Sequence, residues 1–383
     1  MLDLGRFTAP LTFSGLALFS GVLSVPGAMA AAQAQIAPEA ITIAQATANL
    51  TEAQQDRLDD LLIRGEELVE AGQRTEAIAV YREAAQIDTR NARLFSGIGY
   101  LQSQLGDYAA AADAYRVAIE LDPSSTAFRY GLAHSLFQQE NYGAAAEVYR
   151  AIIALDRRQE NAYLGLAAVQ AQQGDTAASL DTYRRLAEVA PVNAEVYLAL
   201  GQHYLGEANY DQAFTYYQRA ANLAPNRAAV YIGLADIAIA REQSDIALDH
   251  LKRAVAVDPR NAMAQFQLGQ LLFERGDRQA AYDPLARAVD LDDSLTGALA
   301  LLGELQLERE NYIQAIFTYR KVVAALPDDP GAHYNLGLAL WGQGQRRGAI
   351  STLNTAKTLY QNQDDLAGAD RAAELLDLWE RIR

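Results

Sequence analysis

The chain has 383 residues, enough for two or three ordinary domains or for one long array of repeats. Its 48 acidic residues outnumber its 32 basic ones, the formal net charge is −16, and no run of Lys or Arg exceeds two residues. A nucleic-acid partner is therefore not expected, because it would require a basic face. The absence of cysteine excludes disulfides, thiolate metal ligands and a cysteine nucleophile.

The first 30 residues have the order of segments that is typical of a secretory signal peptide. Arg6 precedes an uncharged run over residues 7–25, Pro26 interrupts that run, and an Ala-x-Ala cleavage motif ends at Ala30. We therefore expect this segment to direct export and to be removed.

This segment also determines the location that we expect. We predict a signal peptide over residues 1–30, a linker over residues 31–50, and a mature protein in the periplasm or another extracytoplasmic compartment, with no membrane insertion after cleavage. The alternative is a protein anchored in the membrane by an uncleaved N-terminal segment. The 19 uncharged residues of the run are nearly enough to span a bilayer.

From Leu58 to Gln363 the chain repeats itself with a period of 34 residues. Laid out in rows of 34, it forms nine rows without insertion or deletion, and we number the rows 1–9 and the positions in each row 1–34. Position 8 is Gly or Ala in every row, and position 20 is Ala in all rows but one. Position 24 is Tyr in six rows and Leu in three, and position 32 is Pro in five. Several columns recurring together indicate a repeat architecture.

Each row has the pattern of two helices joined by a turn. Positions 4, 7, 8 and 11 form one apolar stripe at helical spacing, and positions 20, 24 and 27 form a second stripe. Small residues at positions 8 and 20 would let the two helices approach closely, with the large residue at position 24 filling the space beside them. Gly near position 15 opens the turn, and Pro at position 32 ends the second helix. One such pair cannot bury both faces alone, so we expect the rows to stack.

Row 5 carries the signature of a known repeat family at the expected offsets: Tyr197, Leu200, Gly201, Tyr204, Ala213, Tyr217 and Pro225. On these residues the sequence resembles the tetratricopeptide repeat (TPR) family over residues 58–363. The resemblance implies an all-α fold, a right-handed superhelical solenoid of antiparallel helix pairs over residues 51–363. We expect residues 364–383 to form a C-terminal capping helix that shields row 9.

Two local features lead to expectations of their own. Thr51 and Gln54 have the spacing of a capping box that begins the first helix. Pro284 falls inside the expected second helix of row 7, where it removes a backbone hydrogen bond, and we expect a kink or a late helix start there.

No motif for catalysis, metal binding or cofactor binding is present in the sequence. The four His residues fall at row positions 4, 9, 10 and 23 and share neither a face nor a spacing suited to a metal ion. There is no G-x-S-x-G motif and no Gly-rich phosphate loop before a Lys. We therefore expect a protein that is not an enzyme and that needs no cofactor or metal.

The resemblance implies that the first helices line the concave side of the solenoid, with positions 2, 5, 9 and 12 facing inward. A large apolar lining with sparse polar groups suits a peptide groove. The residues that we expect to contact a partner are Arg93, Tyr100, Tyr130, His134, Phe137, Gln202, Asp236, Phe266, Gln270, Phe273, Tyr334 and Trp341. In a competing interpretation, positions 5 and 12 mainly pack between rows.

Together these patterns predict a non-catalytic scaffold for protein–protein interaction in the cell envelope. It would bind a peptide or helix of another protein along the concave face, and the sequence does not encode the identity of that partner. The alternative is a structural spacer or assembly subunit of an envelope export, secretion or pilus machine. Such a subunit would use its edges and ends and would associate with itself through the ends of the solenoid.

Overall fold

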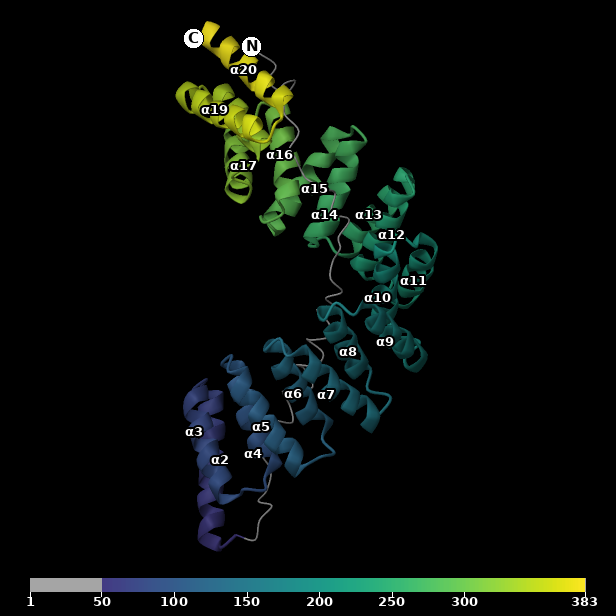
Figure 1. The fold of residues 1–383 in the computed structure, drawn as a ribbon, viewed down its shortest axis with the longest axis vertical. Coiled ribbons are helices and arrows are strands. Elements are labelled where there is room, and N and C mark those ends of the chain that lie inside the picture. Colours follow the sequence, from purple (N-terminus) through teal and green to yellow (C-terminus); the bar gives the residue numbers. More distant parts are fainter. Residues whose placement is uncertain (1–49, 383) are drawn as a thin grey trace. The chain divides into compact units, whose positions relative to one another are not determined.

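The computed structural model describes residues 50–382, and the expected signal peptide and most of the linker lie outside the described residues. Between residues 50 and 382 the chain forms nineteen helices and no strand (Figure 1). The prediction of an all-α solenoid built from consecutive helix pairs is confirmed. From row 2 onward, each first helix begins at position 1 of its row and each second helix at position 17.

The helices follow one another in pairs, one pair to a row. The first helices of rows 1–9 are α2 (Glu52–Glu70), α4 (Ala92–Gln104), α6 (Thr126–Gln138), α8 (Glu160–Gln172), α10 (Ala194–Gly206), α12 (Ala228–Ala240), α14 (Ala262–Glu274), α16 (Thr296–Glu308) and α18 (Pro330–Gly342). The second helices are α3 (Arg74–Ile87), α5 (Tyr108–Leu121), α7 (Tyr142–Leu155), α9 (Thr176–Val189), α11 (Tyr210–Leu223), α13 (Ser244–Val257), α15 (Arg278–Leu291), α17 (Tyr312–Ala325) and α19 (Arg346–Asn362), and α20 (Leu366–Arg381) follows row 9.

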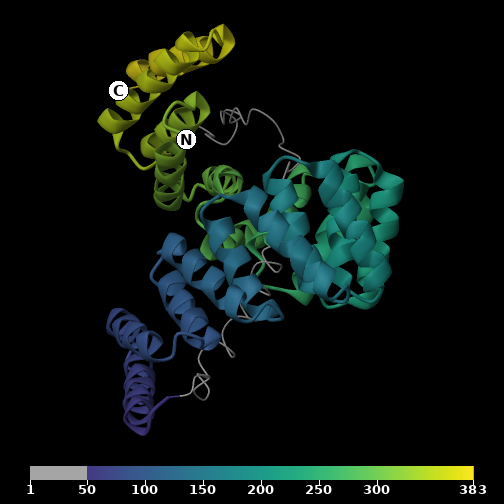
Figure 2. The same ribbon diagram turned by 60° about the horizontal axis from the view of Figure 1, so that its bottom comes forward.

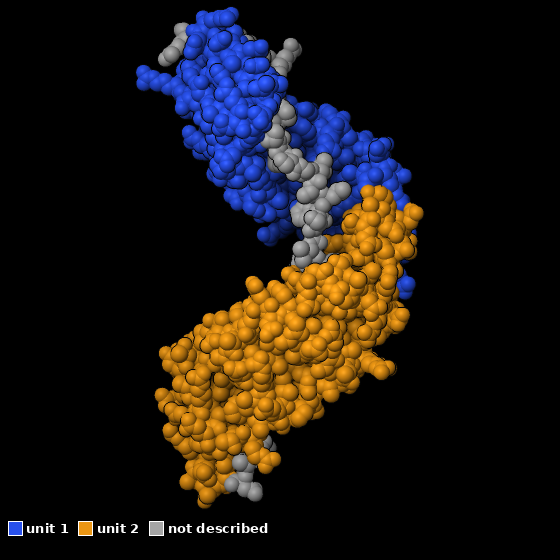
Figure 3. Space-filling view, in the orientation of Figure 1, with its two compact units in different colours: residues 1–19, 217–383 blue, residues 20–216 orange. Residues whose placement is uncertain are grey.

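The described chain divides into two compact units (Figure 3). The N-terminal unit ends at Tyr216, and the C-terminal unit begins at Tyr217. From α2 to α10 in the N-terminal unit and from α12 to α20 in the C-terminal unit, each helix packs against the next along the chain (Figure 2). First helices of neighbouring rows also approach each other, as α4 does α6 and α14 does α16, whereas no two second helices come together to the same degree. Within each unit the rows are therefore closer on the side of the first helices, and that side is concave.

The contact between the two helices of a row depends on a small residue at position 8, which is glycine in six rows and alanine in three. A Cβ atom added to Gly303 would lie 2.8 Å from the Tyr319 ring, and one added to Gly65 would overlap the ring of Tyr81. The prediction that a small residue at position 8 makes room for a large one at position 24 is confirmed. These tyrosine rings are fully buried, or nearly so, and each holds its own pair of helices together.

A second close approach, at position 6, joins one row to the next, and sequence patterning did not reveal it. A Cβ atom added at position 6 would overlap the tyrosine ring of the preceding row in three pairs: Tyr115 with Gly131, Tyr149 with Gly165, and Tyr217 with Gly233. Where position 24 is the smaller Leu, in rows 6 and 7, position 6 of the next row is Gln267 or Leu301. In these five interfaces the two positions therefore match each other in size, whereas Tyr319 of row 8 is followed by the buried Asn335.

The ends and turns of the helices follow local chemistry. The capping box at Thr51 and Gln54 is present, so that prediction is confirmed. Position 15 has a positive φ in all nine rows, although only five of these residues are glycine. The expected late start of α15 is wrong, because this helix begins at Arg278, in register with the others, and continues through Pro284.

At the C-terminal end α20 packs against α19. Trp379 of α20 is fully buried and stacks on Trp341 of α18, with the ring centroids 4.2 Å apart and the ring planes 3° from parallel. Among the described residues, no helix has both the length and the apolar character needed to cross a membrane.

Candidate interaction surface

A strip of contacting side chains lies on the concave side of each unit. We call it the inner surface and define it as positions 9, 12 and 13 of the first helices together with position 17, where each second helix begins. Position 17 belongs to this surface because the turn between the helices places it beside position 12 of its own row. It also lies beside positions 9 and 13 of the next row.

In the N-terminal unit the inner surface of rows 2 and 3 is aromatic. Tyr108 meets His134 edge to face with the ring centroids 6.1 Å apart, and Phe137 meets Tyr142 in the same way at 5.4 Å. Both tyrosines are at position 17, and both are half-buried. Burial lowers the pKa of His134, which favours the neutral imidazole at physiological pH. This part of the surface therefore offers ring faces and edges rather than charge.

In the C-terminal unit an arginine occupies the equivalent place in row 7. Arg278 lies over the Phe273 ring at 4.0 Å, and it forms ion pairs with Glu304 at 2.8 Å and Glu308 at 2.7 Å. Burial raises the pKa of Glu308, which the nearby Arg278 opposes. A hollow of about 320 Å³ lies here between α15 and α16. Arg278 thus joins an aromatic ring of its own row to two carboxylates of the next row.

The same pairing of arginine and aromatic ring recurs in row 9. Arg346, at position 17, lies over the ring of Trp341 at 3.7 Å, and it remains exposed. The opposite face of that indole is covered by Trp379. The guanidinium, and not the indole, is therefore what row 9 presents to a partner.

Asp236 in α12 is a half-buried carboxylate on the inner surface of the C-terminal unit. Its Oδ1 accepts a hydrogen bond from Nε2 of Gln267 at 2.9 Å, and no ion pair neutralises it within the described part of the chain. Burial raises the pKa of Asp236 to about 6, against the partial effect of the Gln267 hydrogen bond. A cationic group from a partner would relieve this desolvation cost.

The twelve side chains expected to contact a partner fall into three groups by exposure. Two are exposed: Arg93 and Gln202. Six are half-buried: Tyr100, Phe137, Asp236, Phe266, Gln270 and Phe273. Four are buried: Tyr130, His134, Tyr334 and Trp341. The structure therefore brings eight of them to an accessible position, within two separate units.

The two tyrosines at position 5 are buried in the stack, and the observed ring contact of Tyr130 is within its own row. Tyr130 and Tyr334 are only 1 % and 3 % exposed, and the Tyr130 ring packs edge to face on Tyr149 with the centroids 6.3 Å apart. Neither ring is presented to a partner in this structure. Residue type alone could not show whether a tyrosine at position 5 is buried or faces a partner, because a tyrosine suits a core as well as a groove.

Position 17 is the part of the inner surface that sequence reasoning missed. The signal was present in the recurrence of Tyr or Arg in seven of nine rows: Arg74, Tyr108, Tyr142, Tyr210, Arg278, Tyr312 and Arg346. It was overlooked because these residues begin the second helix, whereas the resemblance draws attention to the first.

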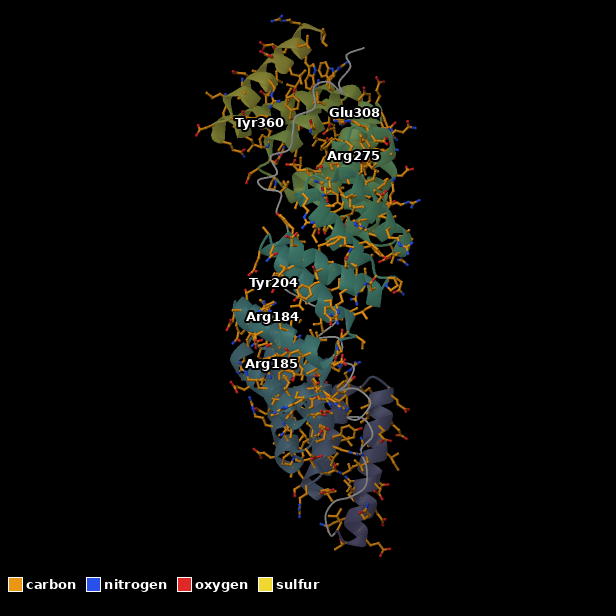
Figure 4. The ribbon with its side chains drawn as sticks, turned by 90° about the vertical axis from the view of Figure 1, so that its right-hand side faces the viewer. Arg184, Arg185, Tyr204, Arg275, Glu308 and Tyr360 are labelled. Carbon is orange, nitrogen blue, oxygen red and sulfur yellow. The ribbon has the colours of Figure 1, made fainter. Side chains whose placement is uncertain are left out.

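A further hollow lies on the outer side of the N-terminal unit, among α7, α8 and α9. It measures about 630 Å³, and Arg150, Arg157 and Arg185 are among the residues that line it. Arg185 lies 5.8 Å from the Tyr163 ring centroid. Arg184, its neighbour on α9, donates from Nη2 to the hydroxyl of Tyr204 in α10 (Figure 4).

A stack of helix pairs with matched small and large residues, and with an accessible concave strip, defines a class of protein. It is a helical-repeat solenoid, in which each repeat contacts only its neighbours and the concave side serves for binding. Models of the tetratricopeptide repeat match residues 96–163, 130–188, 192–260 and 232–295, and a model described as TPR repeat matches residues 65–106 and 303–344. These matches cover well over half of the chain, which belongs to the tetratricopeptide repeat family. Proteins with this fold are typically interaction scaffolds, and membership of the family supports a protein-interaction scaffold.

Similar proteins are found among both sequences and solved structures. A TPR repeat-containing protein of Picosynechococcus is 39 % identical over 67 residues, a match that covers 18 % of this chain and only 17 % of that protein. YrrB, a TPR protein with an unusual peptide-binding site, is 22 % identical with a TM-score of 0.45, and the match covers 51 % of this chain and 99 % of YrrB. A tetratricopeptide repeat protein from Parabacteroides merdae is 16 % identical with a TM-score of 0.48, over 65 % of this chain and 98 % of that one.

Proposed function

We propose that the chain is an exported scaffold whose inner surface binds an extended peptide or a helix of another protein in the cell envelope. The observation that carries this proposal is the layer of aromatic and arginine side chains at positions 12 and 17. Phe137 with Tyr142 and Phe273 with Arg278 are its accessible pairs. Aromatic and arginine side chains of this kind are enriched among the residues that dominate binding energy at interfaces.

The two units would favour different features of a partner. In the N-terminal unit the aromatic cluster of rows 2 and 3 suits apolar side chains. In the C-terminal unit the Asp236 carboxylate, half-buried and without a basic partner among residues 50–382, suits a lysine or arginine of the bound segment. A partner segment with a basic residue therefore fits the C-terminal unit best.

The test uses accessible residues only, because replacing the buried Tyr130 or Trp341 would damage the fold instead. Phe137→Ala combined with Tyr142→Ala alters the N-terminal unit, and Phe273→Ala alters the C-terminal unit. Affinity capture from a native envelope extract, followed by mass spectrometry, identifies partners of the unaltered protein. Titration of a partner so identified then gives the dissociation constant, which we expect to rise at least about tenfold in one of the two variants.

The matched control is Leu155→Ala, which removes an exposed apolar side chain from the outer helix α7. It should leave the dissociation constant unchanged. If circular dichroism shows every variant folded and none binds its partner more weakly, the inner surface is not the binding site.

The strict register of the rows favours the alternative function as a spacer or assembly subunit. Nine rows without insertion or deletion fix the length of the array, which a spacer requires. In that case removal of one whole row would abolish function, whereas the substitutions on the inner surface would not.

The proposed export has a separate test. Peptide mapping of the protein from an envelope fraction should find a new N-terminus shortly after Ala30. Recovery of the protein in the cytosol with Met1 intact would contradict export. An intact N-terminus in the membrane fraction would instead support the uncleaved anchor.

A further inference from the structure

The outer side of row 8 carries an exposed apolar pair that no other row has. Ile313 and Phe317 lie one turn apart on α17, at positions 18 and 22, with 57 % and 64 % of their surface exposed. At position 22 the other rows carry only small, polar or acidic residues: Ala79, Asp113, Glu147, Asp181, Thr215, Asp249, Asp283 and Ser351. At position 18 they likewise carry no large apolar residue: Thr75, Ala109, Gly143, Ala177, Asp211, Asp245, Gln279 and Arg347.

The charge around this pair is also exceptional. α17 and α19 are the only second helices of the nine rows that contain no Asp or Glu. Arg320 and Lys321 continue the exposed face of α17, and Arg347 occupies position 18 of α19. Lys321 forms an exposed ion pair with Asp293 at 2.9 Å, which leaves both groups in contact with water. In a chain with a net charge of −16, two successive outer helices are therefore purely basic.

We infer that the outer face of α17 and α19 docks on an anionic lipid surface. Phenylalanine and isoleucine flanked by Arg and Lys are the composition of segments that lie in the membrane interface, where apolar side chains enter the acyl boundary and basic ones meet anionic headgroups. The protein would lie on the membrane through this face without crossing it. This goes beyond the proposed function, because it concerns the outer side of the solenoid and not its inner surface.

The shape of the site favours a lipid surface over a partner helix. A helix from another protein needs a hydrophobic groove to receive its apolar face. Ile313 and Phe317 instead project from α17, a second helix on the convex side of the unit, and the two hollows described above lie on other helices. Projecting side chains suit a soft, flat surface that closes around them.

The acidity of the rest of the molecule limits how tightly this face can bind. Charges farther away than about 8 Å are largely screened at physiological ionic strength, so the local basic residues dominate at contact. Acidic α20 packs against α19, however, so charge alone would not hold the protein. The apolar pair is therefore essential, and binding should need both Phe317 and an anionic headgroup.

The decisive experiment places a fluorescent reporter in the proposed contact. The two native tryptophans, Trp341 and Trp379, are buried. In the full-length protein the indole introduced by Phe317→Trp is therefore the exposed one. The probe is vesicles of phosphatidylcholine with or without phosphatidylglycerol. We expect a blue shift of the tryptophan emission with the anionic vesicles, none with phosphatidylcholine alone, and loss of the shift at high salt. A local reporter is needed because the apolar run at residues 7–25 could bind vesicles by itself.

The matched control is Ile246→Trp on α13, which places an indole at another exposed isoleucine of an outer helix, between Asp245 and Asp249. It should give no shift. A second variant, Ile313→Glu in the Phe317→Trp background, should abolish the shift without unfolding the protein, because position 313 is exposed. The inference is overturned if the reporter on α17 does not respond, responds equally to phosphatidylcholine, or responds no differently from the control. A shift that appears only with an added protein partner would also overturn it and would assign the face to protein docking.

Discussion

At the scale of single residues, Asp236 stands out because its carboxylate is kept away from water without an opposite charge. The hydrogen bond from Gln267 satisfies one oxygen, yet burial still raises the pKa of Asp236 to about 6. An unfolded chain would give this group a pKa of about 3.9. The folded state therefore holds the proton more tightly than the unfolded state does.

The sign of the effect on stability follows from this difference. A raised pKa in the folded state contributes stability that is complete below about pH 4 and is lost as the pH rises through about 6. Asp236→Asn keeps an acceptor for Gln267 and removes the charge. We expect little change in the free energy of unfolding at pH 4 and a gain of up to about 3 kcal/mol at pH 8, measured by urea denaturation. An equal change at both pH values would show that this carboxyl does not titrate in that range.

The contact between Tyr115 and Gly131 leads to a second prediction about single residues. A methyl group at position 131 would overlap the tyrosine ring, so Gly131→Ala should destabilise the N-terminal unit by about 1–3 kcal/mol, although alanine favours a helix. Adding Tyr115→Leu should recover part of this loss, because leucine at position 24 is already used with a larger position 6 in rows 6 and 7. Thermal and urea unfolding measure both effects.

Gly143→Ala is the matched control for this substitution. Position 143 is also in a helix, but the nearest atom that a new Cβ would meet is 4.0 Å away. It should stabilise the protein by up to about 1 kcal/mol through helix propensity alone. Equal effects at positions 131 and 143 would mean that the tyrosine ring moves freely and does not fix the interface between rows.

These residues also show what the sequence could predict. Glycine at position 8 was identified because it recurs in one column with a physical reason. Gly131 was not, because position 6 is matched to the row before it, and a layout in columns hides pairs that lie in different rows. The burial of Tyr130 could not be predicted either, since the depth of a ring depends on how closely successive rows approach.

At the scale of elements, the turn inside each row requires one residue with a left-handed backbone. Gly174 has a φ of 77°, and the equivalent Ala208 has a φ of 55°. An L-residue in this region carries about 1–2 kcal/mol of steric strain, whereas glycine carries none. The same turn therefore forms at a higher cost in the four rows that lack glycine.

Ala208→Gly should consequently stabilise the protein by about 0.5–1 kcal/mol, which is the relief of strain less the extra entropy of glycine in the unfolded chain. Gly174→Ala should destabilise it by about the same amount. Urea denaturation of the two variants tests the pair. If both substitutions shift stability in the same direction, the strain at this turn is not what distinguishes the rows.

The residues at which helices begin and end were the most predictable features of the fold, since the 34-residue period sets their register. The exception is instructive. Pro284 was expected to delay or bend α15; the helix begins on register at Arg278, and the bend stays a prediction. Proline at position 32 is similarly dispensable, since α7 ends at Leu155 with Arg157 at that position. Packing between rows outweighs the local preference in both cases.

At the scale of the whole molecule, the stack was predictable because each row repeats the same helix pair. What distinguishes one row from another was not predictable, because it depends on which residues meet across an interface. Three tyrosines at position 24, Tyr115, Tyr149 and Tyr217, are followed by glycine at position 6, and the leucines of rows 6 and 7 are followed by a larger residue, although Tyr319 is followed by Asn335. The rows are thus equivalent in length but not freely interchangeable.

This matching predicts that the rows differ in whether they can be removed. Deleting row 7, residues 262–295, would bring Leu251 against Leu301, a pairing equivalent to the existing one of Leu285 with Leu301. Deleting row 6, residues 228–261, would instead bring Tyr217 against Gln267, where the native partner of that ring is a glycine. Both deletions remove 34 residues and keep the register, so only the interface differs between them.

We therefore expect the protein without row 6 to be less stable than the protein without row 7, by about 1–3 kcal/mol for one overpacked contact. Urea denaturation followed by circular dichroism compares two chains of equal length and similar exposed surface, so the two denaturant slopes should agree. Gln267→Gly should restore stability in the first deletion and lower it in the intact chain, where that side chain donates to Asp236. Equal stability of the two deletions would mean that stacking depends on the repeated helix pair alone and that the match between positions 24 and 6 has no energetic role.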